Sequence, residues 1–118
     1  MKIIKCCGVM EKMVYDYIVG KKREADNAVV LVKRNDFFTC IGEDAMILHE
    51  VSGGSVICEV LRIRGVPYLI NGKEQNILVS GFSAAKNQCQ VFMDACLFAG
   101  IRVKMYSMPD VLDKVCLN

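Results

Sequence analysis

The sequence has no tryptophan, only two prolines and a single histidine, His49, among its 118 residues. One histidine is too few for the histidine-containing zinc-finger patterns, so we expect neither a metal nor another cofactor. No stretch approaches the roughly 18 consecutive apolar residues of a membrane-spanning helix, and we expect no membrane partner. The motif Gly-x-x-x-x-Gly-Lys-Ser/Thr is also missing, so the chain has no P-loop for nucleotide hydrolysis.

Cysteine is abundant but lacks the spacing of a metal site or a redox motif. The seven cysteines form no Cys-x-x-Cys pair, and their odd number in a chain of this length argues against a disulfide framework. We expect reduced, mostly buried thiols. The N-terminal segment MKIIKCCGVMEKM has no apolar run long enough for a secretory signal peptide, which predicts a cytoplasmic protein.

Neither sign of charge is in large excess, because 15 Lys and Arg against 13 Asp and Glu give a net charge of +2. Affinity for the phosphates of nucleic acids grows with the number of cations that engage them. Binding to DNA must therefore depend on the geometry of one site or on a partner. The composition, 53% hydrophobic and 24% charged, is that of one domain with its own core, residues 1–118.

Hydrophobic periodicity predicts four helices and six strands. The helices are expected at about 9–21, at 43–52, between Ser83 as N-cap and Gly100 as stop, and at 109–116. The strands are expected at 28–32, 37–41, 56–64, 66–70, 77–79 and 101–105. This order predicts the α+β class, with a single mixed β-sheet of about five to six strands flanked by helices.

Two pairs of residues predict hairpin turns. Asn71-Gly72 is the strongest such signal and lies between the strands at 66–70 and 77–79. Asn35-Asp36 predicts a tight turn in which Arg34 lies opposite Phe37 and Lys33 lies opposite Phe38.

The two adjacent phenylalanines then lie on opposite faces of the hairpin. Phe38 shares its face with Leu31 and Cys40, which predicts a place in the core. Phe37 shares its face with Arg34 and Thr39, nearer the turn. A ring beside a cation at a hairpin tip suits a wedge inserted into a base stack, with the cation on phosphate. The alternative is that Phe37 packs under a helix or in a dimer contact.

The stretch AVVLVKRNDFFTCIGEDA, residues 28–45, resembles the N-terminal, mismatch-recognition domain (domain I) of the MutS family of DNA mismatch-repair proteins. The family pattern is an apolar strand, a basic residue, Gly-Asp-Phe-Tyr-Glu, two apolar residues, Gly and an acidic pair before Ala. The residues that match it are Asp36, Phe37, Gly42, Glu43, Asp44 and Ala45. The segment SGFSAAKNQCQVFMDACLFAGIRVKMY is similar to the family's Gly-Phe-Pro, helix, Gly and basic strand, so the resemblance spans about residues 9–106.

The resemblance implies a MutS domain I-like fold and a non-catalytic DNA-binding module. Phe37 stands where the family's aromatic stacks into a mispaired or bulged base, and Thr39 stands where a glutamate hydrogen-bonds that base. Because Thr39 has no carboxylate, the resemblance implies stacking without that base contact. The expected DNA-binding residues are Phe37, Arg34, Lys33, Asn35, Asp36 and Thr39.

The family's ATPase, clamp and lever domains have no counterpart in this sequence. We therefore expect a stand-alone module that binds DNA weakly, with a second copy or a larger repair or mobile-element protein as its partner. The three basic residues 21–23 precede the first long strand, so we expect them about 20 Å from Lys33. Arg62, Arg64, Arg102 and Lys104 are candidates for further phosphate contacts.

Two other classes of function are alternatives to DNA binding. A protein-interaction or homo-oligomerisation module would keep the same fold and use the high apolar content for a docking surface. An enzyme would need a nucleophile such as Cys40 or Cys58 and a base, and His49 is expected to be exposed on a helix. We expect no catalytic activity.

Overall fold

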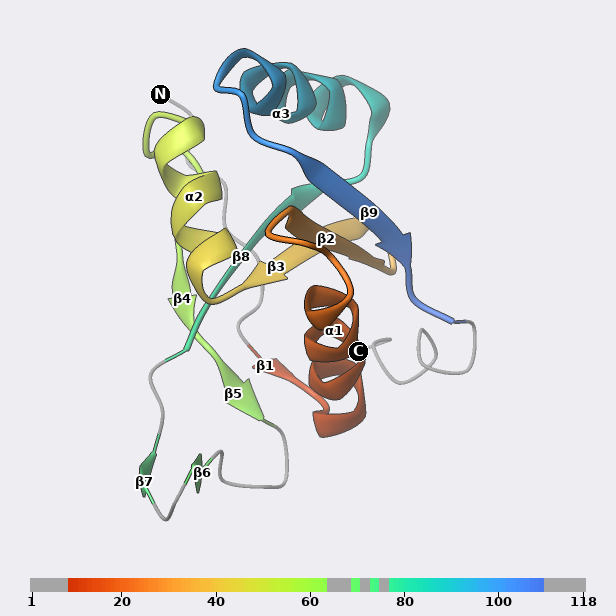
Figure 1. Cartoon of the computed structure of the whole chain (residues 1–118), viewed down its shortest axis with the longest axis vertical. Coiled ribbons are helices and arrows are strands. Elements are labelled where there is room, and N and C mark those ends of the chain that lie inside the picture. The colour runs from red at the N-terminus through yellow and green to blue at the C-terminus, as the bar shows by residue number, and fades with distance from the viewer. Residues whose placement is uncertain (1–8, 64–68, 71–72, 75–76, 110–118) are drawn as a thin grey trace.

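The computed structural model describes residues 9–63, 69–70, 73–74 and 77–109 (Figure 1). The helices are α1 (Lys12–Arg23), α2 (Glu43–Val51) and α3 (Lys86–Phe98). The longer strands are β2 (Val29–Arg34), β3 (Phe37–Ile41), β8 (Leu78–Ser83) and β9 (Val103–Ser107). The two-residue strands are β1 (Val9–Met10), β4 (Glu59–Val60), β5 (Arg62–Ile63), β6 (Leu69–Ile70) and β7 (Lys73–Glu74).

The main sheet has five strands in the order β4-β8-β3-β2-β9. Only β2 and β9 run parallel, and the other neighbours are antiparallel. Two small pairs lie outside this sheet, β1 with β5 in parallel and β6 with β7 antiparallel. The expected α+β class with a mixed sheet is therefore confirmed.

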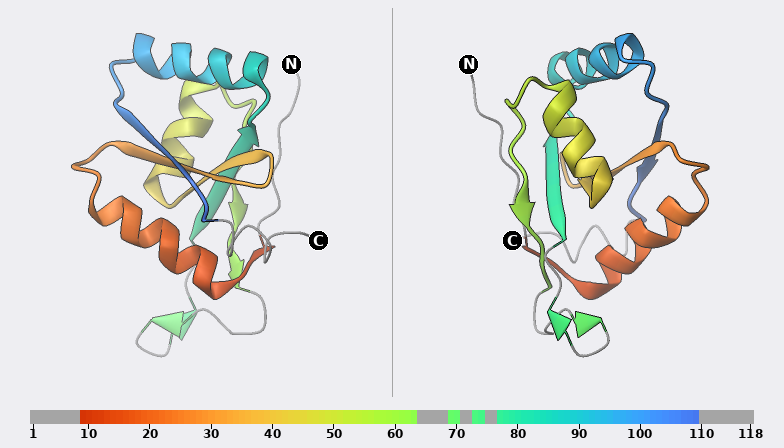
Figure 2. Two further views of the ribbon diagram at one scale, coloured as in Figure 1. Left: turned by 90° about the vertical axis from the view of Figure 1, so that its right-hand side faces the viewer. Right: turned by 60° about the vertical axis from the view of Figure 1, so that its left-hand side comes forward.

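Helices cover both faces of the main sheet, and each face has its own apolar cluster (Figure 2). Alternate residues of β2 point to opposite faces, and all four apolar residues at its start are buried. Val30 and Val32 pack with α1, whereas Val29 and Leu31 pack with α2 and α3. Within the described residues, no helix is long and apolar enough to cross a membrane.

The acidic pair that begins α2 has two different roles. Glu43 is exposed, whereas Asp44 is 3% exposed and lies under β2. The Asp44 carboxylate accepts hydrogen bonds from the Val30 backbone N–H at 3.1 Å and from the Lys22 ammonium at 2.9 Å. The backbone pairing of β2 with β3 ends at Val32, before it reaches Val30. The Asp44 carboxylate accepts the hydrogen bond from the Val30 N–H that a residue of β3 would otherwise accept. This carboxylate ties α1, β2 and α2 together.

Two of the predicted strands differ from those in the structure, one in its continuity and one in its partner. The expected strand at 56–64 is two short strands, β4 and β5, which belong to different sheets. The apolar residues at 77–79 do not pair with Leu69–Ile70, which pair with Lys73–Glu74. They lead into β8, which continues to Ser83 and lies between β4 and β3.

The start of α3 differs from the prediction, whereas Gly100, with a φ of 74°, ends the helix as expected. The helix begins after Ala85 rather than at Ser83, although the Ser83 hydroxyl accepts a hydrogen bond from the Ala85 N–H at 3.1 Å. Phe92 and Cys96 are buried, whereas Ala85 and Ala99 are exposed. The Asn71-Gly72 turn, Arg64 and residues 110–116 of the expected last helix lie outside the described residues.

Candidate nucleic-acid interface

The hairpin between β2 and β3 has the predicted register. Arg34 pairs with Phe37, and Lys33 pairs with Phe38. Asn35 has a φ of 55°, and it is the only one of the two turn residues with a positive φ. A positive φ at the first central residue alone is the geometry of a type II′ turn, which matches the twist of the flanking strands. The turn therefore holds Arg34 and Phe37 side by side.

The hairpin is supported by neighbouring chain on both sides. The Ala84 N–H donates to the Asp36 carbonyl at 2.8 Å, and the Met108 N–H donates to the Lys33 carbonyl at 2.9 Å. β3 is also paired with β8 up to Phe37 and Ser83. The tip is consequently a fixed corner of the sheet and not a projecting finger.

The two phenylalanines occupy different environments. Phe38 is 9% exposed and belongs to the core beneath α2 and α3, where its ring centroid lies 5.8 Å from that of Phe82. Phe37 is half-buried and packs against the edge of the cluster beneath α1. The core position of Phe38 is confirmed. Phe37 lies between the two predicted alternatives, an accessible wedge and a packed ring, because part of its ring is packed and part is accessible.

Thr39 lies in the interior, with a side chain that is 0% exposed. Its hydroxyl accepts a hydrogen bond from Arg34 Nε at 3.1 Å, and Arg34 Nη1 donates to the Val9 carbonyl at 3.3 Å. The structure thus places Thr39 beneath Arg34 and away from the surface. Arg34 itself is half-buried, and its guanidinium links the hairpin to β1.

The remaining expected site residues lie around the turn. Asn35 and Asp36 are exposed, and Lys33 is half-buried on the face opposite Arg34. The structure therefore brings five of the six predicted residues to the surface of one corner. The exposed Asp36 carboxylate opposes phosphate binding, because like charges repel at this range.

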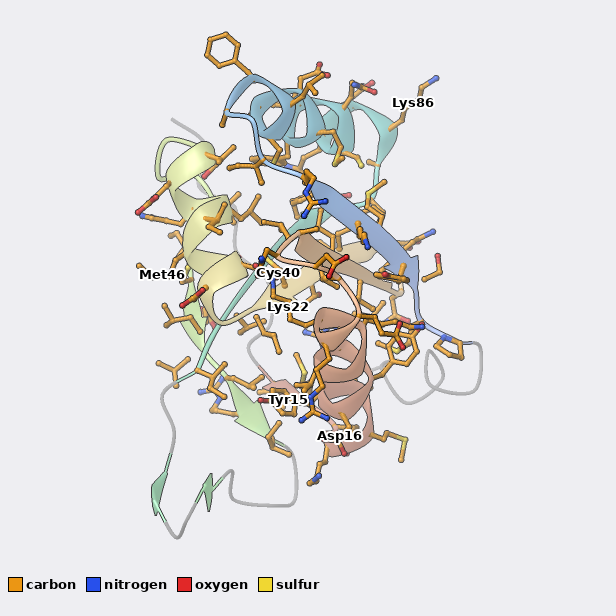
Figure 3. The ribbon with its side chains drawn as sticks, viewed as in Figure 1. Tyr15, Asp16, Lys22, Cys40, Met46 and Lys86 are labelled. Atoms are coloured by element: carbon orange, nitrogen blue, oxygen red, sulfur yellow. The ribbon has the colours of Figure 1, made fainter. Side chains whose placement is uncertain are left out.

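The sequence pattern does not predict one basic residue near this corner. Lys86 is the first residue of α3 and points away from the body of the molecule (Figure 3). The hydrogen bond from Ala84 to Asp36 brings the start of α3 next to the turn. The first turn of α3 has no acidic residue and no side-chain cap at Ala85, so its N-terminal positive potential is not neutralised locally. The sequence did carry a signal for this site, because the helix begins with lysine and has no acidic residue in its first turn.

The side chains of the basic run in the last turn of α1 point in different directions. The Lys21 ammonium is 5.1 Å from the centroid of the Tyr106 ring, and Tyr106 pairs with Val32 near the hairpin end of β2. Lys22 points inward to Asp44 (Figure 3). Lys21 therefore reaches along the sheet toward the hairpin, whereas Lys22 has a structural role.

The groups considered for catalysis are held by the fold. Cys58 donates from Sγ to the Ala45 carbonyl, and burial raises the pKa of this thiol despite a hydrogen bond with Ser80 that lowers it. His49 is half-buried rather than exposed, and its Nδ1–H donates to the Val56 carbonyl at 2.6 Å. No group of three or more potential metal ligands comes together within the described residues. Of the cysteines in that part of the chain, Cys40 and Cys96 are buried and Cys58 and Cys89 are half-buried, all as thiols.

The chain matches no model of a protein family, and no curated protein is significantly similar to it in sequence.

Proposed function

We propose that this protein is a non-catalytic, cytoplasmic DNA-binding module that inserts Phe37 into distorted or mispaired DNA. The observation that carries the proposal is the environment of Phe37. The ring is half-buried against the apolar cluster beneath α1 and lies next to an exposed turn. Phe37 is paired with Arg34 of the neighbouring strand β2. This arrangement fits the role that the MutS resemblance gives to Phe37.

A wedge must keep its position while it separates stacked bases, which costs a few kcal/mol per base step. A fully exposed ring would lose rotamer freedom on binding, and a fully buried ring could not reach the DNA. The inner part of Phe37 packs against the core, and the hairpin is hydrogen-bonded on both sides at Lys33 and Asp36. The ring is therefore held in place before DNA arrives.

Phosphate contacts would come from both sides of the turn. Lys33 extends from β2, and Lys86 stands at the positive end of α3. The guanidinium of Arg34 adds positive potential beside Phe37 while it holds Thr39 and Val9. So few cations give weak binding with a modest salt dependence.

The proposed preference is for distorted stacking and not for the identity of a base. The family's glutamate position is Thr39, which has no carboxylate and lies fully buried under Arg34. Bulged and mispaired sites are favoured because their bases are already partly unstacked, which lowers the cost of inserting a ring.

The proposal is tested by fluorescence anisotropy with matched, mismatched and bulged duplexes at low and moderate salt. The wild-type chain is expected to prefer the bulged duplex, and Phe37→Ala is expected to lose most of that preference. Phe98→Ala is the matched control, because Phe98 is 96% exposed and lies at the far end of α3. Equal preference in the wild type and Phe37→Ala would refute the wedge, and no binding at low salt would refute DNA binding.

A second candidate function, self-association, is favoured by the outer surface of α3. Val91, Leu97 and Phe98 are the three most exposed large apolar residues within the described part of the chain. Such a surface suits contact with a second copy, because apolar side chains gain free energy when they leave water. Sedimentation velocity tests it: Phe98→Glu should convert a concentration-dependent dimer into a monomer, whereas a wild-type monomer at all concentrations contradicts it.

A further inference from the structure

Strand β9 forms one edge of the main sheet and is paired with β2 on one side only. No strand pairs with its other side in the described parts of the chain. The left view of Figure 2 shows β9 in front of the sheet, between α3 and α1, with no helix or strand over it. Its outer edge therefore presents backbone groups that another strand can use.

Two hydrogen bonds fix which backbone groups face outward. The Val29 N–H donates to the Arg102 carbonyl, and the Met108 N–H donates to the Lys33 carbonyl, both at 2.9 Å. In a parallel pair, alternate residues direct their N–H and C=O groups to the same side. Positions 102, 104, 106 and 108 therefore face β2, and the backbone groups of Val103 and Met105 face away.

The carbonyl of Ser107 supports this assignment. It accepts a hydrogen bond from the Tyr17 hydroxyl of α1 at 3.3 Å, outside the ladder with β2. The outward row that remains for a partner comprises the N–H and C=O groups of Val103 and Met105 and the N–H of Ser107. A short extended segment can pair with this row.

The side chains along this edge differ between the two faces of the sheet. Lys104 pairs with Val30 and so lies on the α1 face. Val103 and Met105 pair with Val29 and Leu31, on the face covered by α2 and α3. Met105 is 47% exposed, and Val103 is half-buried. One face of the edge is thus cationic, and the other is apolar.

We propose that β9 binds an extended peptide segment of a partner protein in which acidic and apolar residues alternate. Successive side chains of a strand point to opposite faces, so the acidic residues would lie beside Lys104 and the apolar residues beside Val103 and Met105. The edge contains none of the proposed DNA-binding residues, although Ser107 at its end pairs with Lys33, and the inference does not depend on DNA binding.

Charge selects such a peptide over a second copy of the chain. β9 and the residue before it carry Arg102 and Lys104 and no acid. The Arg102 guanidinium donates to the Asp26 carbonyl, and none of the ion pairs between described residues includes Arg102 or Lys104. Edge-to-edge pairing of two copies would place these cations on one face of a joined sheet, where they repel.

The probe is a short fluorescein-labelled peptide in which Glu alternates with Val, and its control has the same composition with all Glu residues at one end. The full chain is expected to bind the alternating peptide at least about tenfold more tightly than the control. In amide NMR spectra, the added peptide should shift Val103, Met105 and Ser107 most strongly. Equal affinity for the two peptides, or no binding, would overturn the proposal.

Two variants examine the backbone and the charge separately. Met105→Pro removes an N–H that β2 does not use, so the fold should persist while peptide affinity falls about tenfold or more. Met105→Ala keeps the N–H and is its control.

Lys104→Glu should reject the Glu peptide and accept a Lys–Val peptide of the same pattern. If peptide affinity is unchanged in both Met105→Pro and Lys104→Glu, the outer edge of β9 is not the peptide-binding site. Phe37→Ala should leave peptide binding unaffected, which separates this result from the DNA measurement.

Discussion

At the scale of single residues, Arg34 and Thr39 show how a motif position can change its role. The hydroxyl of Thr39 is buried and accepts from Arg34 Nε, so the pair forms an internal contact. The sequence predicts both residues at the DNA, Arg34 because it lies opposite Phe37 and Thr39 because it stands at the glutamate position of the MutS family. The alternation of faces was predicted correctly, but the depth of Thr39 depends on α1, which packs over that face. Local patterns do not reveal such a distant neighbour.

Replacing Thr39 by valine should test this contact. Thr39→Val keeps the volume and removes the acceptor of Arg34 Nε, so we expect the free energy of unfolding to fall by about 1 kcal/mol. Urea denaturation gives the value, and Thr39→Ser, which retains the hydroxyl, should lie closer to the wild type. A Thr39→Val variant as stable as the wild type would show that the hydrogen bond contributes nothing.

The thiols of Cys58 and Cys96 should make the stability of the fold depend on pH in the alkaline range. Burial raises the pKa of Cys58 and Cys96 above the ordinary value of 9.0. As the pH rises, the unfolded state therefore loses these protons before the folded state does. The contribution to stability is complete below about pH 9 and should decline above it. Urea unfolding at several pH values, compared with a Cys58→Ala, Cys96→Ala double variant, should show a flatter decline in the variant. Parallel curves would contradict this explanation.

At the scale of elements, α2 is fastened to β2 by Asp44. Asp44→Ala would leave the Val30 N–H and the Lys22 ammonium without this carboxylate, and we expect a loss of about 2–3 kcal/mol in unfolding free energy. Glu43→Ala is the matched control, since it removes an acid from the same helix turn at an exposed position. Chemical denaturation of both variants measures the difference, and equal losses would mean that Asp44 acts only on the helix dipole.

The pairing of β8 with β3 depends on the absence of a side chain at Gly81. A Cβ at this position would overlap the Phe38 carbonyl oxygen of the neighbouring strand. Gly81→Ala must therefore displace backbone in the centre of the sheet, and we expect destabilisation of about 2–3 kcal/mol. Gly20→Ala serves as the control, because a Cβ there meets no atom within 4 Å. A Gly81→Ala variant with a melting temperature at or above that of the wild type would contradict the close approach.

At the scale of the whole molecule, features set by neighbouring residues were predictable and features set by distant pairing were not. The register of Arg34 with Phe37 follows from two turn residues and was correct. The sequence predicts one strand at 56–64, but the structure has two short strands with different partners. β4 pairs with β8, which begins at Leu78, and β5 pairs with β1, which begins at Val9. Lys86 is 50 residues from Asp36 in the sequence, and only the folded chain shows that α3 starts beside the turn.

The small number of cations at the hairpin corner limits the salt dependence of DNA binding. Lys33, Arg34 and Lys86 together would displace about three counterions, so the logarithm of the association constant should fall with the logarithm of salt concentration with a slope of about −3. Anisotropy titrations over a range of salt give the slope, and Lys86→Ala should make it shallower by about one. A slope near zero would contradict phosphate contacts at this corner.

If Phe37 separates stacked bases, the fluorescence of a base analogue reports the loss of stacking. The adenine analogue 2-aminopurine, placed next to a bulge, brightens when its stacking is lost. We predict a rise in its fluorescence when the wild-type chain binds, and no rise when Phe37→Ala is bound to saturation. An equal rise with both proteins, or none with bound wild type, would contradict insertion of Phe37.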